Sequence, residues 1–313
     1  MLYSTYSETN RKAGICPIHR VKMRMLMENQ LKICAPAKIN LFLEVTGRRA
    51  DGYHLLDTVM QTVGLCDELT LDYRPEGEGI RLTCQKKYIP TDETNVAYRA
   101  AELFLRQANR KGGLDLHLEK HIPVAAGLGG GSADAAAVFL GLNRMFNDPF
   151  SPEELCALGT ELGADIPFCI RKGCVRATGI GEVFEESTPL SDLIPVIAIG
   201  SKGSSTPAAY KALDSIGYCG SESALPLCRA LSQGDRREIC RLLFNAFEEV
   251  IFPQNSDAEF LKKELLRLGA WGALMSGSGA SVYGLFPGLP QARRACASLR
   301  KQGFFSVVAP AQS

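Results

Sequence analysis

Hydrophobic and polar residues alternate in several short stretches of the first half of the chain. This period of two predicts strands over residues 33–45 and 114–120, and a pair of strands over residues 65–73 and 79–84. Residues 95–109 instead repeat apolar side chains at helical spacing, which predicts an amphipathic helix. The first half therefore combines strands with at least one helix.

Capping signals define the starts of the predicted helices. Thr94 is the expected N-cap of the helix over residues 95–109. Residues 151–154 combine a serine cap, a proline in the first turn and a glutamate three positions after the cap, so they predict another helix start. An alanine-rich stretch over residues 133–145 also predicts a helix, and strands are expected within residues 168–177.

The second half of the chain mixes the same two kinds of element. Ser256 and Glu259 have the spacing of a capping box. Strands and helices do not alternate as regular βαβ repeats, so an α+β, two-layer arrangement is favoured over a doubly wound sheet. The predicted strands are residues 195–199, 270–275, 281–286 and 304–309, and the predicted helices are residues 207–213, 225–231, 256–268 and 290–301.

Chain length and a break in the pattern predict two domains. At about 150 residues per domain, 313 residues correspond to two units. Glycines and acidic residues interrupt the pattern near residues 180–190. We expect one domain over residues 31–184 and a second over residues 185–313, after a disordered extension over residues 1–30. This polar, mildly basic extension has no secretory apolar core, and a short organelle presequence is the alternative.

Composition argues against several classes of partner. The chain has 35 Lys and Arg against 34 Asp and Glu, without the basic excess of proteins that bind nucleic acid. No apolar run approaches the roughly 18 residues that a membrane helix needs. Eleven irregularly spaced cysteines favour reduced, mostly buried thiols in a cytoplasmic protein. His117 and His121 lie in an alternating stretch, so a strand is favoured there over a metal site.

The strongest chemical signal is a glycine-rich loop over residues 123–133. Four glycines lie between residues 127 and 131, and an alanine-rich helix follows at once. Glycines let the backbone approach a ligand, and the free N–H groups at a helix start favour an anion such as phosphate. Ser132 adds a hydroxyl group. No Lys-Ser/Thr pair follows the last glycine, so the loop is not a Walker A motif. The alternative is a flexible linker or a tight turn.

A second glycine-rich stretch, residues 276–281, lies between two predicted strands. It is either a plain hairpin turn or a second phosphate-binding turn. The sequence alone favours neither.

Polar residues in apolar surroundings supply candidate catalytic groups. Lys38 and Asn40 are two positions apart, so on one strand they face the same side. If Asp165 meets Lys38 in space, the two form a general base and its charge partner. The alternatives are a solvated strand edge for the first pair and an ordinary loop aspartate. Tyr53 and His54 follow a tight turn and either stack on a flat base or anchor the turn by packing.

These residues resemble a known family. The stretch from Pro123 to Ala135, Pro-x-x-x-Gly-Leu-Gly-Gly-Gly-Ser-Ala-Asp-Ala, is similar to the signature loop of the GHMP small-molecule kinases. The resemblance implies two domains, the N-terminal one like ribosomal protein S5 domain 2 and the C-terminal one ferredoxin-like, with substrates in the cleft between them. Four further stretches narrow it to one branch of the family: residues 35–43, 49–54, 162–168 and 276–279.

The resemblance implies an ATP-dependent kinase that phosphorylates an alcohol. The narrower branch transfers the γ-phosphoryl group of ATP to the 2-hydroxyl of a diphosphocytidyl methylerythritol, in the non-mevalonate route to isoprenoid precursors. ATP is then a co-substrate and Mg²⁺ is expected with it, although no carboxylate of this chain is identified as its ligand. The partners are these small molecules, with no nucleic acid and no membrane, and the chain acts as a monomer or homodimer.

The resemblance also assigns roles to matching positions. Asp165 is the expected general base, Lys38 holds it and the accepting hydroxyl, and Asn40 adds a hydrogen bond. Asn95 and Lys120 match the adenosine side. The loop residues expected around the ATP phosphates are Pro123, Val124, Ala125, Ala126, Gly127, Leu128, Gly129, Gly130, Gly131, Ser132 and Ala133.

The substrate side is assigned in the same way. Tyr53 and His54 are expected to recognise the cytosine, with Tyr210 as a second stacking ring where the family often has Phe. Gly277 and Gly279 are expected to contact the substrate. Two alternatives remain: a GHMP kinase that acts on another alcohol, such as homoserine or mevalonate, and a nucleotide-binding or interaction module without catalysis.

Overall fold

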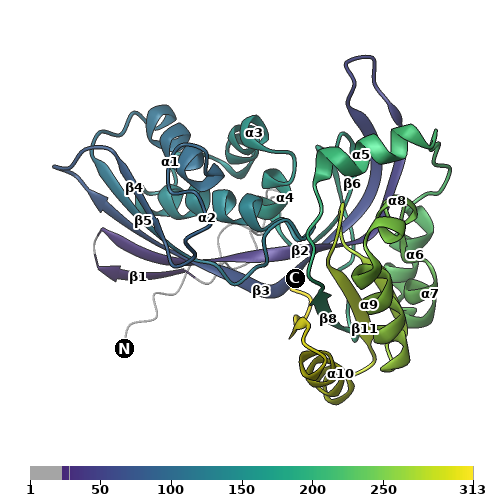
Figure 1. Cartoon of the computed structure of the whole chain (residues 1–313). Helices are drawn as coiled ribbons and strands as arrows, with labels where there is room; N and C mark the ends of the chain where they lie inside the picture. Colours follow the sequence, from purple (N-terminus) through teal and green to yellow (C-terminus); the bar gives the residue numbers. More distant parts are fainter. Residues whose placement is uncertain (1–22, 28, 313) are drawn as a thin grey trace.

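A computed structural model describes residues 23–27 and 29–312 of the 313-residue chain. In this part of the chain two lobes lie side by side, each built on its own sheet (Figure 1). The first sheet has the strand order β1-β2-β3-β5-β4, with β6 on β3, β7 on β6 and β9 on β2. Its strands are β1 (Met23–Met27), β2 (Gln30–Arg48), β3 (His54–Arg74), β4 (Ile80–Cys84), β5 (Gly113–Glu119), β6 (Cys174–Gly179), β7 (Val183–Glu186) and β9 (Phe244–Asn245).

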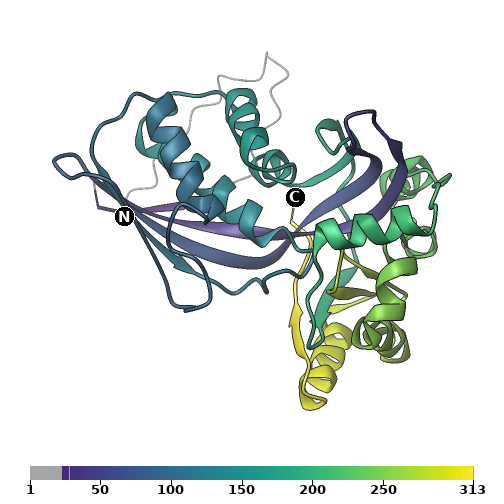
Figure 2. The same cartoon turned by 45° about the horizontal axis from the view of Figure 1, so that its top comes forward.

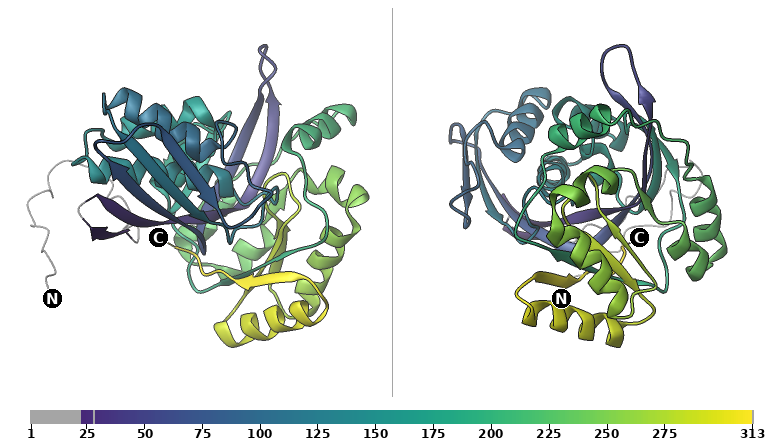
Figure 3. Two further views of the ribbon diagram at one scale, coloured as in Figure 1. Left: turned by 60° about the vertical axis from the view of Figure 1, so that its left-hand side comes forward. Right: turned by 45° about the vertical axis from the view of Figure 1, so that its right-hand side comes forward.

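Strands β2 and β3 are much longer than the alternation predicts. They pair antiparallel from Gln30 opposite Asp72 to Arg48 opposite His54. Their inner positions are buried almost without interruption, because helices cover one face at one end and the second lobe covers the other end. The tip of this hairpin projects from the body of the molecule (Figures 1 and 3). The two strands thus run through both lobes.

Helices α1 (Val96–Gln107), α2 (Gly130–Met145), α3 (Pro152–Leu162) and α4 (Ile166–Arg171) cover one face of the first sheet (Figure 2). The alanine-rich α2 lies at its centre, where small side chains allow close packing. The predicted capping box of α3 is confirmed, because Ser151 Oγ accepts from Glu154 N while the Glu154 carboxylate accepts from Ser151 N.

The second lobe is a four-stranded antiparallel sheet in the order β10-β11-β8-β12. This order, with helices before β10 and before β12, is the ferredoxin-like arrangement, so the predicted α+β, two-domain fold is confirmed. The elements of the lobe are β8 (Ile194–Ile199), α5 (Thr206–Ser215), α6 (Leu225–Gln233), α7 (Arg236–Arg241), α8 (Glu248–Ile251), a 3₁₀ turn (Phe252–Gln254), α9 (Ser256–Arg267), β10 (Gly272–Met275), β11 (Val282–Phe286), α10 (Leu289–Lys301) and β12 (Phe305–Val308).

Two predictions about strands are wrong. β4 pairs in parallel with β5 and not with β3. Helix α1 connects the two strands, and a helical crossover brings the chain back in the same direction. Residues 166–171 form α4 and not the start of a strand. Their apolar run is buried on all sides, and a pattern without periodicity fits a short buried helix as well as a strand.

Two helix caps lie one residue from their predicted positions. Asn95, not Thr94, caps α1, and its Oδ1 accepts from Ala97 N. Asn255, not Ser256, caps α9, and its Oδ1 accepts from Ala258 N. Asparagine caps a helix as well as serine or threonine does. The sequence pattern therefore could not tell which of the two adjacent residues caps each helix.

The chain crosses between the two lobes more often than a single domain boundary predicts. The division after residue 184 falls inside β7, and the chain enters the second sheet at β8. β9 then returns to the first sheet beside β2. Within the predicted extension of residues 1–30, residues 23–27 form strand β1 against β2, so this part is not disordered. Residues 1–22 lie outside the described part of the chain.

Two expectations from composition can be compared with the structure. In the described part of the chain, no helix combines the length and apolar character needed to cross a lipid bilayer. Of the ten cysteines in the described part of the chain, five are half-buried, Cys219 is exposed, and four are buried: Cys156, Cys169, Cys174 and Cys296. The expectation of mostly buried thiols therefore holds only in part. Burial raises the pKa of the Cys174 thiol to about 12.

Candidate active site

A cavity of about 770 Å³ opens between the two lobes, and most of the predicted site residues line it. Of the predicted set, Ala133 and Gly279 do not line the cavity. Ala133 is buried in α2, and a side chain on Gly279 would point at Met275. The predicted residues that do line it are Lys38, Asn40, Tyr53, His54, Asn95, Lys120, Pro123, Val124, Ala125, Ala126, Gly127, Leu128, Gly129, Gly130, Gly131, Ser132, Asp165, Tyr210 and Gly277.

The glycine-rich loop ends where α2 begins, at Gly130. The preceding Gly129 is in the left-handed region with φ 68°, and no side chain caps the helix. A Cβ on Gly129 would lie 3.0 Å from Lys38 Cγ, so both the conformation and the contact favour glycine. The backbone N–H of Lys38 donates to Leu128 O at 3.0 Å. This bond fixes the loop to β2 and leaves the open helix start facing the cavity, which is the arrangement that binds phosphate.

The second glycine-rich stretch is the turn between β10 and β11, and it supports the first loop. A Cβ on Gly127 would lie 2.0 Å from Ser276 O, so the two backbones are in direct contact. Ser276 Oγ donates to Gly127 O at 2.9 Å, and Ser281 N donates to Ala126 O at 3.1 Å. The hairpin interpretation of this stretch is therefore confirmed. The turn also holds the loop of the other lobe in place.

Lys38, Asn40 and Asp165 meet at the side of the loop. Lys38 Nζ donates to Asn40 Oδ1 at 2.7 Å, as the shared strand face predicts, and Asn40 Nδ2 donates to Thr58 Oγ1 at 2.9 Å. Lys38 Nζ also lies 3.7 Å from Asp165 Oδ2. The lysine side chain is 6% exposed and the aspartate side chain 41%, so the carboxylate is the solvent-facing member of the ion pair.

Helix α4 explains why the Asp165 carboxylate is available. Asp165 is the N-cap residue of α4, yet its side chain accepts no capping hydrogen bond. Ile166 and Pro167, directly after it, are buried and anchor the helix. The backbone is thus held firmly while the carboxylate stays free to act in the cavity, within ion-pair distance of an ammonium group.

Aromatic rings gather at another part of the cavity. Tyr53 is 61% exposed at the end of the projecting hairpin. The rings of His54 and Tyr210 stack with centroids 4.5 Å apart, and Phe247 meets Tyr210 edge-on at 4.9 Å. His54 Nε2 lies 2.7 Å from Asp214 Oδ1. Burial raises the pKa of the Tyr210 hydroxyl to about 12, so this side chain stays neutral.

Sequence reasoning missed two residues of this region. Asp214 lies four positions after Tyr210 on α5, so the two side chains share a helix face, a signal that was present in the sequence. Phe247 lies in the link between β9 and α8, and its ring partner Tyr210 is distant in the chain. No local pattern identifies it.

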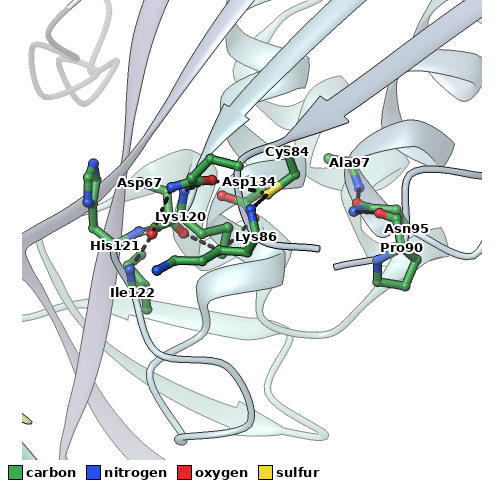
Figure 4. Close-up of polar contacts among 11 residues, drawn as sticks. Asp67, Cys84, Lys86, Pro90, Asn95, Ala97, Lys120, His121, Ile122 and Asp134 are labelled. Atoms are coloured by element: carbon green, nitrogen blue, oxygen red, sulfur yellow. Dashed lines mark hydrogen bonds and ion pairs between the residues drawn. The ribbon is translucent and has the colours of Figure 1, made fainter. Parts of the chain in front are cut away.

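Lys120 and Asn95 are both held by polar partners (Figure 4). Lys120 Nζ donates to Asp134 Oδ2 at 2.7 Å and also to Asp67 Oδ2, and all three side chains are at least 95% buried. Asp67 Oδ1 also accepts from the backbone N–H groups of His121 and Ile122, at 2.5 and 2.8 Å.

These bonds join the two ends of the glycine-rich loop. Lys120 lies just before the loop and Asp134 lies just after it, in the first turns of α2. Burial raises the pKa of the Asp134 carboxyl well above its usual range. Asn95 uses its side chain locally, since Oδ1 caps α1 and Nδ2 donates to Pro90 O at 2.7 Å. Both residues line the cavity, and Lys120 Nζ and Asn95 Nδ2 each keep one N–H donor that these contacts do not use.

Comparison with known proteins agrees with this geometry. The GHMP kinases N terminal domain matches residues 95–173, and the GHMP kinases C terminal domain matches residues 226–304. The 4-diphosphocytidyl-2-C-methyl-D-erythritol kinase of Synechococcus sp. strain JA-2-3B'a(2-13) is 46% identical, over 86% of this chain and 89% of the relative. The protein of the same name from Clostridium novyi strain NT is 40% identical, over 83% of this chain and 92% of the relative.

Solved structures give the same result. A crystal structure of 4-(cytidine 5'-diphospho)-2C-methyl-D-erythritol kinase superposes with a TM-score of 0.74 at 34% identity, covering 89% of this chain and 99% of the other. The homoserine kinase of Cytophaga hutchinsonii has a TM-score of 0.70 at 20% identity, which shows a shared fold alone. The chain therefore belongs to the 4-diphosphocytidyl-2-C-methyl-D-erythritol kinases, a branch of the GHMP kinase family.

Proposed function

We propose that this protein transfers the γ-phosphoryl group of ATP to the 2-hydroxyl of 4-diphosphocytidyl-2-C-methyl-D-erythritol, in non-mevalonate isoprenoid precursor biosynthesis. The products are the 2-phosphate and ADP. The observation that carries the proposal is the ion pair of Lys38 and Asp165 beside the glycine-rich loop, in a cavity that also holds the His54 and Tyr210 rings. A phosphate site, a base and an aromatic site for a nucleobase are the three parts that this reaction needs.

The side chains divide the reaction between them. The Asp165 carboxylate takes the proton of the accepting hydroxyl, whose oxygen then forms a bond to the γ-phosphorus as the bond to the leaving ADP breaks. Lys38 is the charge partner of the Asp165 carboxylate and donates to the hydroxyl oxygen. Asn40 holds the Lys38 ammonium at 2.7 Å. The backbone N–H groups of the loop bind the phosphates. The Ser132 hydroxyl, which also lies at the start of α2, binds the phosphates as well.

Mg²⁺ enters this reaction with ATP as part of the nucleotide substrate. Among the residues that the structure describes, no group of three or more His, Cys, Asp or Glu side chains is arranged to hold a metal ion. The phosphate oxygens of ATP would be its main ligands, and the Ser132 hydroxyl at the start of α2 would be a protein group available to it. The ion supplies neutralisation of the phosphate charge.

Cellular location, oligomeric state and partners are proposed on the same basis. We propose that the protein works in the cytoplasm as a monomer or homodimer, on small molecules only. The near-neutral charge of the chain and its irregularly spaced cysteines support this assignment.

A substrate panel tests the proposed activity. Purified protein with ATP and Mg²⁺ should phosphorylate the diphosphocytidyl substrate and leave homoserine and mevalonate unchanged, as measured by coupled ADP release. Activity on homoserine or mevalonate, without any on the diphosphocytidyl substrate, would contradict the proposed function and indicate another GHMP kinase activity. ATP binding without turnover on any alcohol would favour a non-catalytic nucleotide-binding module.

Substitution of Lys38, the buried member of the ion pair with Asp165, tests the role of this pair in catalysis. Lys38→Ala should lower kcat at least about tenfold, because the Asp165 carboxylate loses its charge partner and the hydroxyl loses a donor. The dissociation constant of ATP should change less than kcat does, since backbone groups supply most of the phosphate contacts. Steady-state kinetics and equilibrium ATP binding measure the two effects. Intact turnover would remove Lys38 from the mechanism.

A further inference from the structure

The imidazole of His54 is held on two sides by one helix. α5 carries Tyr210, whose ring stacks on the imidazole at an interplanar angle of 21°, and Asp214, whose Oδ1 lies 2.7 Å from Nε2. Arg48, on the other strand of the hairpin, places Nη1 3.3 Å from Asp214 Oδ2. Figure 2 shows α5 beside this hairpin. The contact therefore joins the two lobes at the aromatic part of the cavity.

The hydrogen bond between His54 and Asp214 fixes where the imidazole proton lies. An ionised carboxylate can only accept, so Nε2 must carry the hydrogen that it donates. The hydrogen bond from His54 is the largest of the effects that lower the pKa of the Asp214 carboxyl, which keeps that carboxyl ionised. In the neutral imidazole, the other nitrogen, Nδ1, is then an acceptor.

An acceptor at this place distinguishes two pyrimidines. Cytosine carries an amino group, a donor, where uracil carries a carbonyl oxygen, an acceptor. An imidazole nitrogen without hydrogen can pair with the amino group and repels the carbonyl. A site built for one hydrogen-bonding pattern rejects a ligand that leaves its buried polar groups unpaired.

We propose that Asp214 is a positioning residue that fixes the His54 tautomer, so that Nδ1 accepts a hydrogen bond from the cytosine amino group and selects cytidine over uridine. This inference rests on the proposed function, because it concerns the nucleobase of that substrate. Tyr210 supports the same geometry by stacking on the imidazole. Thr206, at the start of α5, bonds through Oγ1 to Ser278 Oγ at 2.7 Å and holds the helix against the β10–β11 turn.

The kinetic experiment compares two substrates in two variants. Wild type, Asp214→Asn and Lys211→Gln are each assayed with the diphosphocytidyl substrate and with its uridine analogue. Asn keeps the size of Asp, but its amide can donate to Nε2 and so stabilise the other tautomer. The ratio of kcat/KM for the cytidine over the uridine substrate should fall about tenfold in Asp214→Asn. The KM for ATP should stay within twofold of the wild-type value.

Lys211→Gln is the matched control, because it removes a charge from an exposed position of the same helix. Its substrate ratio should equal that of wild type. An equal loss of kcat/KM for both substrates in Asp214→Asn, with an unchanged ratio, would overturn the proposal, because a merely structural role predicts that result.

A second measurement separates this inference from the proposed function. The chain has four histidines, so the ring nitrogens of His54 can be assigned by comparison with a His54→Gln spectrum in ¹⁵N NMR. At pH 8, the wild-type protein should show hydrogen on Nε2, and Asp214→Asn should show hydrogen on Nδ1. Hydrogen on Nδ1 in the wild type would overturn the inference even if the kinase activity is found. The Nε2 tautomer without activity on the cytidyl substrate would instead reject the proposed function.

Discussion

Asp165→Asn should lower kcat by about 10²- to 10⁴-fold, because an amide cannot take the proton of the accepting hydroxyl. Asn has the size and shape of Asp, and the side chain makes no capping bond that the fold needs. The variant should therefore fold normally and bind ATP as wild type does. Single-turnover kinetics would show the loss in the chemical step, and circular dichroism would confirm the fold.

The matched control is Glu161→Gln on α3. This substitution also removes one carboxylate, from an exposed position of the same lobe that does not line the cavity. Its kcat should stay within about twofold of wild type. Turnover of Asp165→Asn within about threefold of wild type, with the fold intact, would remove Asp165 as the base. Catalysis would then rest on positioning and charge alone.

Local signals predicted the parts of the site that depend on neighbouring residues. Four glycines followed at once by an alanine-rich helix predict a phosphate loop, and Gly129 adopts the left-handed conformation that this turn requires. Lys38 and Asn40 are two positions apart on one strand and do meet. These predictions needed only the geometry of a strand and of a helix start.

Local sequence patterns could not predict contacts between segments that are distant in the chain. Asp165 was a candidate only if it met Lys38, and it does so because α4 lies against the strand that carries the lysine. The parallel pairing of β4 with β5 was missed, although a helix was predicted between the two strands. That order alone indicates a crossover and a parallel pair.

One missed residue did leave a signal in the alternation. Asp67 occupies the same face of β3 as Leu65 and Leu69, and all three are buried. A carboxylate in phase with buried leucines needs a partner, because an isolated buried charge is very costly. The sequence could have shown that Asp67 is paired. It could not show that the partner is Lys120, since that pairing depends on how β5 lies against β3.

Lys120→Met should reduce the free energy of unfolding by about 3–5 kcal/mol, because it leaves Asp67 and Asp134 facing each other without a cation. Methionine matches the length of the lysine stem, so the loss comes from the charge and not from a cavity. The Asp67 side chain is fully buried and cannot turn to water. Urea unfolding followed by circular dichroism measures the change.

Lys32→Met provides the comparison within the same sheet. Lys32 pairs with Glu68, the residue next to Asp67, but its side chain is 40% exposed and that of Glu68 is 35% exposed. Water screens this pair, so its loss should cost no more than about 1 kcal/mol. Equal effects of the two substitutions would show that burial does not set the strength of the Lys120 cluster. A larger effect of Lys120→Met would show that burial sets the strength of this cluster, whose bonds join the two ends of the glycine-rich loop.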